Sequence, residues 1–347
     1  MYGIKNNFRE TKKMKLRFIA VIVFALAIVV ALSACDEIGP PFFITDSQGL
    51  EYTLNVVDDT YIVSIGDGAK DKESLTIPAR FNGYAVKTVD NFKSDNLKNV
   101  VICEGVTTIN ANAFAKCRNL EKIEIPESVK SIGTYSFANC PSLAEVNIKS
   151  NYAAIGAFAF YYCDELTTVT LSEGVNSIGP SAFAKCYALK EIVIPNSVKT
   201  IMSWAFSDCA TLSSVTFGSS LETIEMYAFY DCDNIRSIVI PDSVKTIGEG
   251  AFKECEHLKD VVLGSGLTKI EKDCFNSCGR LESIVIPASV TEIGSKALAK
   301  CKDLREVKYC GNADSWSAMT KESDWDNRTG DYVIIYDWVA EGAPSEQ

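Results

Sequence analysis

Histidine is nearly absent from this chain: His257 is the only one among 347 residues. A cysteine or serine hydrolase needs a base held beside its nucleophile, and histidine most often supplies it. His257 lies two residues after Cys255, but the equivalent positions of the repeat described below hold unrelated side chains, so we interpret His257 as a solvated loop residue. The chain is therefore expected not to be an enzyme, with a cysteine hydrolase as a distant alternative.

Motifs of several ligand-binding classes are missing as well. The sequence has no glycine-rich phosphate loop and no EF-hand frame. Cys274 and Cys278 have neither zinc-finger spacing nor a nearby histidine, so we expect no metal and no cofactor. Basic residues are outnumbered, with 34 Lys and Arg against 45 Asp and Glu, a net charge of −11. Such a surface disfavours nucleic acid and anionic membranes, although acidity also simply keeps an exposed protein soluble.

Long apolar runs are limited to one, from Phe18 to Leu32, which is shorter than the roughly 18 residues of a spanning helix. Basic residues precede it and Leu32-Ser-Ala-Cys35 follows, an arrangement typical of an export signal. We predict a cleaved signal peptide at residues 1–34, starting at Met1 or Met14. The four residues resemble the lipobox of bacterial lipoproteins, which implies that Cys35 is acylated and anchors the protein outside the cell. The alternative is an ordinary signal peptide in which Cys35 is incidental.

What the sequence does have is a 23-residue unit that recurs without insertion from Leu97 to Asp303. Each unit carries an apolar leader and two alternating apolar residues, as in Leu120, Ile123 and Ile125, and then an isoleucine, a large apolar residue and a cysteine. A fixed period of this length indicates a solenoid in which neighbouring coils stabilise one another. We predict a strand-rich, α/β-type leucine-rich-repeat horseshoe with nine units over residues 97–303. The cysteines are Cys117, Cys140, Cys163, Cys186, Cys209, Cys232, Cys255, Cys278 and Cys301.

Irregular segments flank the repeats and are predicted to cap them. Residues 35–49 have little pattern and are predicted to be a tether. Residues 50–96 should hold a hairpin over residues 50–65, with a turn at Asp58 and Asp59, and an irregular first repeat. Residues 304–339 should hold a partial repeat and a C-terminal cap, made of a short helix capped by Asp314 and a strand over residues 331–337. Residues 340–347 are predicted to be a disordered tail.

Cysteine is abundant, and 13 residues in an exported chain would ordinarily suggest disulfides. Nine of them occupy equivalent positions of successive coils, so each has two equidistant neighbours and pairing could not use all nine. A buried free cysteine packs as a small hydrophobe. We therefore predict a column of packed free thiols. Cys103 and Cys310 lie nine repeats apart and cannot meet.

Many units share one pattern, seen as Ile240-Pro-Asp-Ser-Val-Lys-Thr-Ile-Gly-Glu-Gly-Ala-Phe-Lys-Glu-Cys255. The pattern resembles the signature of the BspA-like leucine-rich repeat family of bacterial surface proteins, also called the Treponema pallidum type, over roughly residues 75–310. The resemblance implies an exported binding protein, and several members are implicated in adhesion to host matrix or to other bacteria. It implies a role class and names no ligand.

Two surfaces are candidates for binding. Outward strand positions form columns, one of which turns apolar and uncharged towards the C-terminus, as a partner site on a concave sheet would, although β-branched residues also simply suit strands. This valine stripe comprises Val193, Thr216, Val239, Val262 and Val285. The second candidate is an aromatic column two residues before the phenylalanines, where aromatic side chains either anchor a partner or pack between turns. It comprises Tyr135, Phe158, Trp204 and Tyr227.

These observations together predict a non-catalytic, lipid-anchored protein on the outer face of a bacterial membrane. It would bind a protein or glycan on host matrix or other cells through a repeat face. We expect it to bind no nucleic acid and no cofactor. The valine stripe is the first expected site, because a strand-lined inner surface repeats its side chains at every coil. An envelope structural protein without a discrete ligand is the alternative.

Overall fold

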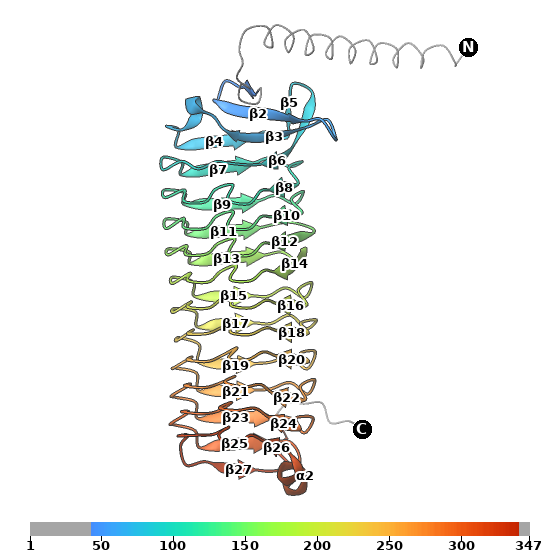
Figure 1. Ribbon diagram of the computed structural model, residues 1–347, viewed down its shortest axis with the longest axis vertical. Helices are drawn as coiled ribbons and strands as arrows, with labels where there is room; N and C mark the ends of the chain where they lie inside the picture. Colours follow the sequence, from blue (N-terminus) through green and yellow to red (C-terminus); the bar gives the residue numbers. More distant parts are fainter. Residues whose placement is uncertain (1–42, 340–347) are drawn as a thin grey trace, which may run out of the picture. The chain divides into compact units, whose positions relative to one another are not determined.

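The structure is a computed structural model that describes residues 43–339 (Figure 1). The predicted signal peptide at residues 1–34, the predicted acylation site Cys35, most of the predicted tether at 35–49 and the predicted tail at 340–347 lie outside the described residues. Within residues 43–339, no helix is both long and apolar enough to cross a membrane.

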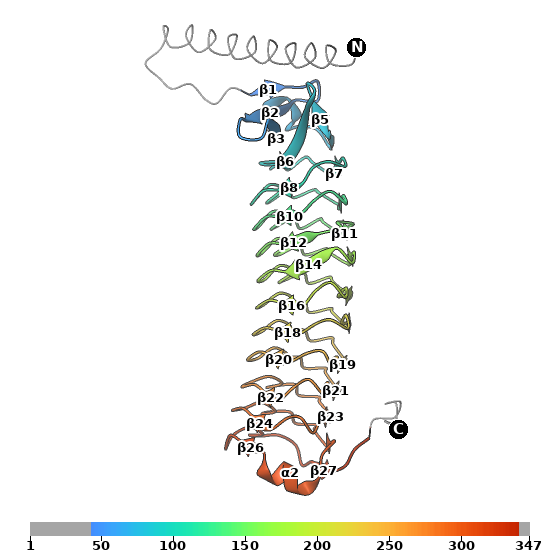
Figure 2. The ribbon, with the colours of Figure 1, turned by 90° about the vertical axis from the view of Figure 1, so that its right-hand side faces the viewer.

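Each coil holds two strands, and Figures 1 and 2 show them as two columns of labelled arrows. The first strands carry the two alternating apolar residues of the repeat and pair in parallel with equivalent positions one coil away. They are β7 (Asn99–Ile102), β9 (Lys122–Ile125), β11 (Glu145–Ile148), β13 (Thr168–Leu171), β15 (Glu191–Val193), β17 (Ser214–Thr216), β19 (Ser237–Val239), β21 (Asp260–Val262), β23 (Ser283–Ile286) and β25 (Glu306–Tyr309). This strand-rich solenoid with 23-residue coils confirms the predicted fold class; the horseshoe curvature stays an expectation.

The second strands are short and were not predicted. Each ends on the isoleucine that follows the first strand. Neighbouring second strands pair in parallel, with one break between the strand of Ile247 and the strand of Ile270. They are β8 (Thr108–Ile109), β10 (Ser131–Ile132), β12 (Ala153–Ile155), β14 (Val175–Ile178), β16 (Thr200–Ile201), β18 (Thr223–Ile224), β20 (Thr246–Ile247), β22 (Lys269–Ile270) and β24 (Glu292–Ile293).

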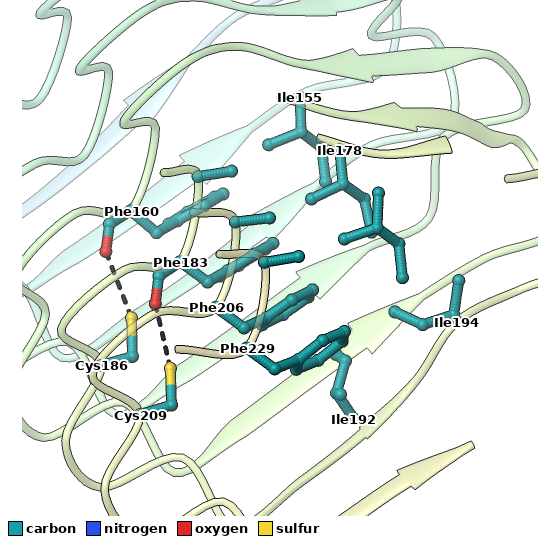
Figure 3. Close-up of a cluster of buried hydrophobic side chains, with 14 of the residues drawn as sticks. Ile155, Phe160, Ile178, Phe183, Cys186, Ile192, Ile194, Phe206, Cys209 and Phe229 are labelled. Atoms are coloured by element: carbon teal, nitrogen blue, oxygen red, sulfur yellow. Dashed lines mark hydrogen bonds between the residues drawn. The ribbon is translucent and has the colours of Figure 1, made fainter. Parts of the chain in front are cut away.

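The core between strands and turns is built from repeated columns of side chains. Phenylalanines from Phe114 to Phe275 stack on one another with ring centroids 5.0 to 5.6 Å apart. Figure 3 shows part of this column, with Phe206 and Phe229 beside Ile192 and Ile194 of the first-strand side. Because every coil buries the same apolar face against its neighbours, the core runs through the whole repeat region.

The nine equivalent cysteines are free and fully buried, as predicted. Each thiol donates a hydrogen bond to the phenylalanine carbonyl of the preceding coil, as Cys209 does to Phe183 at 3.2 Å (Figure 3). Burial raises the pKa of Cys209 to about 12. These thiols, the thiol ladder, therefore serve as packing groups held in the neutral form.

The turn that carries each phenylalanine forms a third set of contacts between coils. Tyr135, Phe137 and Asn139 donate their N–H groups to carbonyl oxygens of the next coil, at 3.0, 2.8 and 2.8 Å. Equivalent donors recur coil after coil, and all point towards the C-terminal end. Tyr135 and Asn139 have φ of 57° and 58°, a left-handed conformation that this turn ladder holds in place.

A β-rich cap covers the N-terminal end. It contains β1 (Ile44–Thr45), β2 (Leu50–Asn55), β3 (Thr60–Ile65), the 3₁₀ turn η1 (Asp67–Ala69), β4 (Ser74–Ile77), β5 (Arg80–Phe81) and β6 (Tyr84–Val89). β2 and β3 form an antiparallel hairpin, and β3 pairs in parallel with β6, which joins it to the second-strand sheet.

The C-terminal cap contains α2 (Ala313–Ala318), β26 (Thr320–Lys321) and β27 (Val333–Ile335), which continue the two sheets. The prediction that Asp314 caps the helix is wrong. Asn312 is the N-cap: its backbone is extended and its side-chain oxygen accepts from the Ser315 N–H at 2.9 Å. Asp314 lies inside the first turn, where its charge suits the helix end but its side chain is not the cap.

Candidate functional site

The strand face is the surface formed by outward side chains of the first strands. Near its N-terminal end the charges are paired across coils, as Lys149 is with Glu124 at 2.7 Å. From Glu191 to Asp260 the valine-stripe column itself carries no charge. The Asp260 carboxylate is held by the Ser283 hydroxyl, which donates to it at 2.9 Å. The stripe is therefore an uncharged strip flanked by two acidic residues, Glu191 and the hydrogen-bonded Asp260.

Most members of the valine stripe are solvent-accessible. Val193 is 60% exposed and Val239 is 65% exposed, Thr216 is exposed and Val262 is half-buried. Parallel pairing sets Val193 beside Thr216, and Val239 beside Val262. No ladder joins β17 to β19 among the described strands, so the stripe consists of these two paired segments.

Val285 does not belong to an exposed stripe, because it is only 9% exposed. Its partner in register is Lys308, whose Nζ lies 4.8 Å from the Trp338 ring. The Lys308 side chain is itself largely buried, so the C-terminal cap occupies this end of the column. The prediction that Val285 faces solvent is therefore wrong, and the usable stripe ends at Val262.

One exposed member of this column was missed by the sequence reasoning. Val101 is 57% exposed and lies in register beside Thr76 of β4. It precedes the first charged member of the column, Glu124, by one repeat. Extending the 23-residue spacing backwards into β7 would have found it.

The aromatic column lies on the turns. The phenylalanines of the turns and the isoleucines of the strands meet in one core, so outward side chains of turn and strand lie on opposite sides of it (Figure 3). The structure brings the column together as two separate stacks: Tyr135 on Phe158 at 4.7 Å and Trp204 on Tyr227 at 4.4 Å between ring centroids. Ser181 occupies the position between them.

Further aromatic rings join each stack from the next positions of the turn. Tyr161 packs edge-on against Phe158 at 5.6 Å, and Tyr230 packs against both Trp204 and Tyr227. Part of each ring therefore packs between coils, although Tyr135 and Trp204 remain exposed. Stacking covers one face of each of these two rings and leaves the exposed part for a partner.

The contacts of Cys255 and His257 do not form a catalytic pair. The Cys255 thiol is buried and donates to the Phe229 carbonyl at 3.2 Å, and burial raises its pKa to about 12. The His257 Nδ1 lies 2.9 Å from the carbonyl oxygen of Asp233. Each group is engaged with backbone rather than with the other. Among the described residues there is also no cluster of three or more His, Cys, Asp or Glu able to hold a metal ion.

Several solved structures are similar to this chain. A leucine-rich repeat protein from Bacteroides ovatus ATCC 8483 is 21% identical, with 85% of this chain and 90% of that chain covered and a TM-score of 0.49. A leucine rich cell surface protein from Faecalibacterium prausnitzii A2-165 is 27% identical, covering 82% and 99%, with a TM-score of 0.39. The T. pallidum leucine-rich repeat protein is 19% identical, covering 82% and 99%, with a TM-score of 0.37.

No curated protein matches the sequence. The family model described as a BspA type Leucine rich repeat region, in six copies, matches residues 89–212 and 176–305. The two matches overlap and together span more than half of the chain, and they cover the coils whose strands, phenylalanines and thiols are described above. The chain belongs to the BspA-type leucine-rich repeat family.

Proposed function

We propose that this protein is a non-catalytic bacterial cell-surface protein that binds a protein or glycan partner through its strand face, in adhesion or host–microbe contact. The observation that carries the proposal is the uncharged valine stripe from Val193 to Val262, in which Val193, Thr216 and Val239 are exposed. Members of the family are generally non-catalytic binding proteins. A similar structure is named as a cell surface protein, which supports the location.

Apolar contact along the stripe would supply affinity, and the flanking carboxylates of Glu191 and Asp260 would orient the partner. The alternative is an envelope structural protein without a discrete ligand, which would be favoured if neither candidate surface were accessible to solvent. The exposure of both surfaces argues against it. Val239 and Trp204 are both exposed.

The test is a double variant, Val239→Lys with Val262→Lys, assayed against purified matrix proteins and cell-wall glycans. We expect binding to be lost while the circular dichroism spectrum and unfolding midpoint stay close to those of the parent, because outward strand residues contribute little to the core. Val101→Lys and the single variant Val239→Lys are the matched pair, since each places one positive charge at an exposed valine of the same column, the first outside the stripe and the second inside it.

A second control changes Trp204 and Tyr227 to alanine on the other side of the core. If that pair abolished binding in a folded protein and the valine pair did not, the strand face would be refuted and the aromatic column would take its place.

We further propose that the protein is held at the membrane by a lipid on Cys35, with residues 1–34 removed. Cys35→Ala should then move the protein from the detergent phase into the soluble fraction. Retention of the variant in the membrane phase would mean that the apolar run of residues 18–32 is an uncleaved helix.

A further inference from the structure

A small cavity of about 260 Å³ opens on the turn side near the C-terminal end of the repeats. Its walls come from three successive coils and from the C-terminal cap. The charged residues that line it are Lys253, Asp273, Lys296, Lys300 and Arg328, and the polar ones are Asn276 and Asn327. Four cationic side chains and one carboxylate therefore share one opening, a net charge of +3, in a chain whose own net charge is −11.

Three cations of this cavity, Lys296, Lys300 and Arg328, lack within the described residues the ion pairs that some lysines of the solenoid have, and the fourth, Lys253, has its chain neighbour Glu254 at 4.0 Å. Lys259 pairs with Glu282 at 3.0 Å and Lys272 with Glu249 at 2.7 Å, each across neighbouring coils. Within residues 43–339, no ion pair neutralises Lys296, Lys300 or Arg328. Like charges around one opening repel, and the repulsion is relieved when an anion enters.

The carboxylate of Asp273 favours some anionic ligands over others. One of its carboxylate oxygens, Oδ1, accepts a hydrogen bond from the Asn276 side chain. The other oxygen, Oδ2, lies 3.8 Å from the Lys272 Nζ, which is beyond hydrogen-bond distance. A simple inorganic anion would be repelled by this carboxylate, whereas a ligand that also carries hydroxyl groups could donate one to it.

We propose that this cavity binds an anionic sugar, a saccharide residue that carries a carboxylate, sulfate or phosphate group. Lys296, Lys300 and Arg328 hold the anionic group by charge-assisted hydrogen bonds, and a hydroxyl of the ring donates to Asp273. The cavity is smaller than the roughly 300 Å³ at which drug-sized sites begin, so it accepts one sugar residue of a longer chain. The site is separate from the strand face and does not depend on it.

The chain itself supplies conservative variants for the test. Lys300 and Lys116 occupy equivalent positions of two coils, with φ of 62° and 65°, and a third coil has Asn139 there with φ of 58°. Lys300→Asn therefore removes a cation from the cavity without disturbing the turn, and Lys116→Asn is the matched control far from it. Asp273→Asn keeps the acceptor for Asn276 and removes the negative charge.

Binding is measured by titration calorimetry with uronate, sulfated, phosphorylated and neutral oligosaccharides of equal length, and with inorganic sulfate and phosphate. We expect at least one anionic oligosaccharide to bind and the neutral one not to. Lys300→Asn should weaken that binding by about tenfold or more, Lys116→Asn by less than about twofold, and added salt should weaken it in the parent. Asp273→Asn should reduce the preference for the sugar over the inorganic anion.

The proposal is overturned if no anionic oligosaccharide binds, or if Lys116→Asn weakens binding as much as Lys300→Asn does. It is also overturned if inorganic sulfate or phosphate binds as tightly as the best sugar, because Asp273 would then have no role. Loss of sugar binding in the Val239→Lys and Val262→Lys variant would assign the sugar to the strand face instead.

Discussion

The side-chain amide of Gln48 meets the backbone of Thr76 with both of its polar groups. Its Nε2 donates to the Thr76 carbonyl oxygen and its Oε1 accepts from the Thr76 N–H, each at 3.1 Å. Thr76 lies in β4, the edge strand of the first-strand sheet at its N-terminal end. An exposed edge can pair with another chain, and here one side chain occupies the groups that a further strand would use.

We predict that Gln48→Ala speeds hydrogen exchange of the Thr76 amide while lowering the free energy of unfolding by only about 1 kcal/mol, because the two hydrogen bonds are exposed. Amide exchange followed by NMR measures the first effect and urea unfolding the second. Gln48→Glu retains an acceptor for the Thr76 N–H and should keep that amide protected. Equal exchange rates in all three proteins would show that the contact does not close the edge.

The thiol ladder should make stability depend on alkaline pH. Burial raises the pKa of Cys209 to about 12, against about 8.5 in an unfolded chain. The stabilisation that this neutral thiol gives is complete below the unfolded pKa and is lost as pH rises towards the folded one. Above pH 9 the unfolded state has released the proton and the folded state has not, so each such thiol lowers the free energy of unfolding by about 1.4 kcal/mol per pH unit.

Urea unfolding of the parent and of Cys209→Ala between pH 6 and pH 10.5 tests this. The two proteins should differ by a constant amount below pH 8, and above pH 9 the parent should lose stability more steeply. Curves that stay parallel across the whole range would mean that Cys209 ionises in the folded protein as easily as in the unfolded one.

A side chain added at Gly250 should be costly because the Tyr227 ring covers this position. Its φ is 62°, and an added Cβ would lie 2.4 Å from Cε1 of the Tyr227 ring. Gly83 also has a positive φ, 85°, but an added Cβ there meets nothing within 4 Å. Gly83→Ala therefore measures the backbone cost alone, about 1 to 2 kcal/mol. Gly250→Ala should cost clearly more in urea unfolding, and equal losses would show that the Tyr227 ring moves aside freely.

The loss of stability on replacing a phenylalanine of the column should depend on the size of the new side chain. Phe206 stacks between Phe183 at 5.4 Å and Phe229 at 5.3 Å. Phe206→Ala should lower the free energy of unfolding by about 3 to 5 kcal/mol, because it leaves a cavity in a closely packed column. Phe206→Leu should cost less, since Leu298 fills the same position in the last coil without exposure. Losses of equal size would mean that stacking between rings, rather than filled volume, is what the column supplies.

The repeat region was predictable because each position is sampled in coil after coil. The thiol ladder and the first strands follow from a 23-residue period that no other arrangement of the chain explains. The second strands were not predictable, because a two-residue segment such as Ser131–Ile132 is too short to show the alternation of apolar and polar residues that marks a strand. Its partner is the equivalent segment of the next coil, not a neighbour in sequence.

The remaining errors lie where a cap meets the repeats. Val285 follows the period perfectly, yet Lys308 and Trp338 place a cap against it. The cavity of Lys300 and Arg328 likewise combines a repeat position with one outside the frame. A period predicts contacts between equivalent residues, and it contains no information about contacts made by segments that occur once.

The common direction of the turn ladder makes the two ends of the repeat region chemically unequal. At the C-terminal end, the donors of Leu298 and Lys300 are satisfied by carbonyl oxygens of Trp325 and Asn327 in the cap. At the other end, the Ile65 N–H donates to the Asn91 carbonyl oxygen. A chain stripped of both caps would present donors at one end and acceptors at the other, a complementary pair. Copies of it would associate head to tail into open filaments rather than closed dimers. The caps therefore limit the solenoid to the length of one chain.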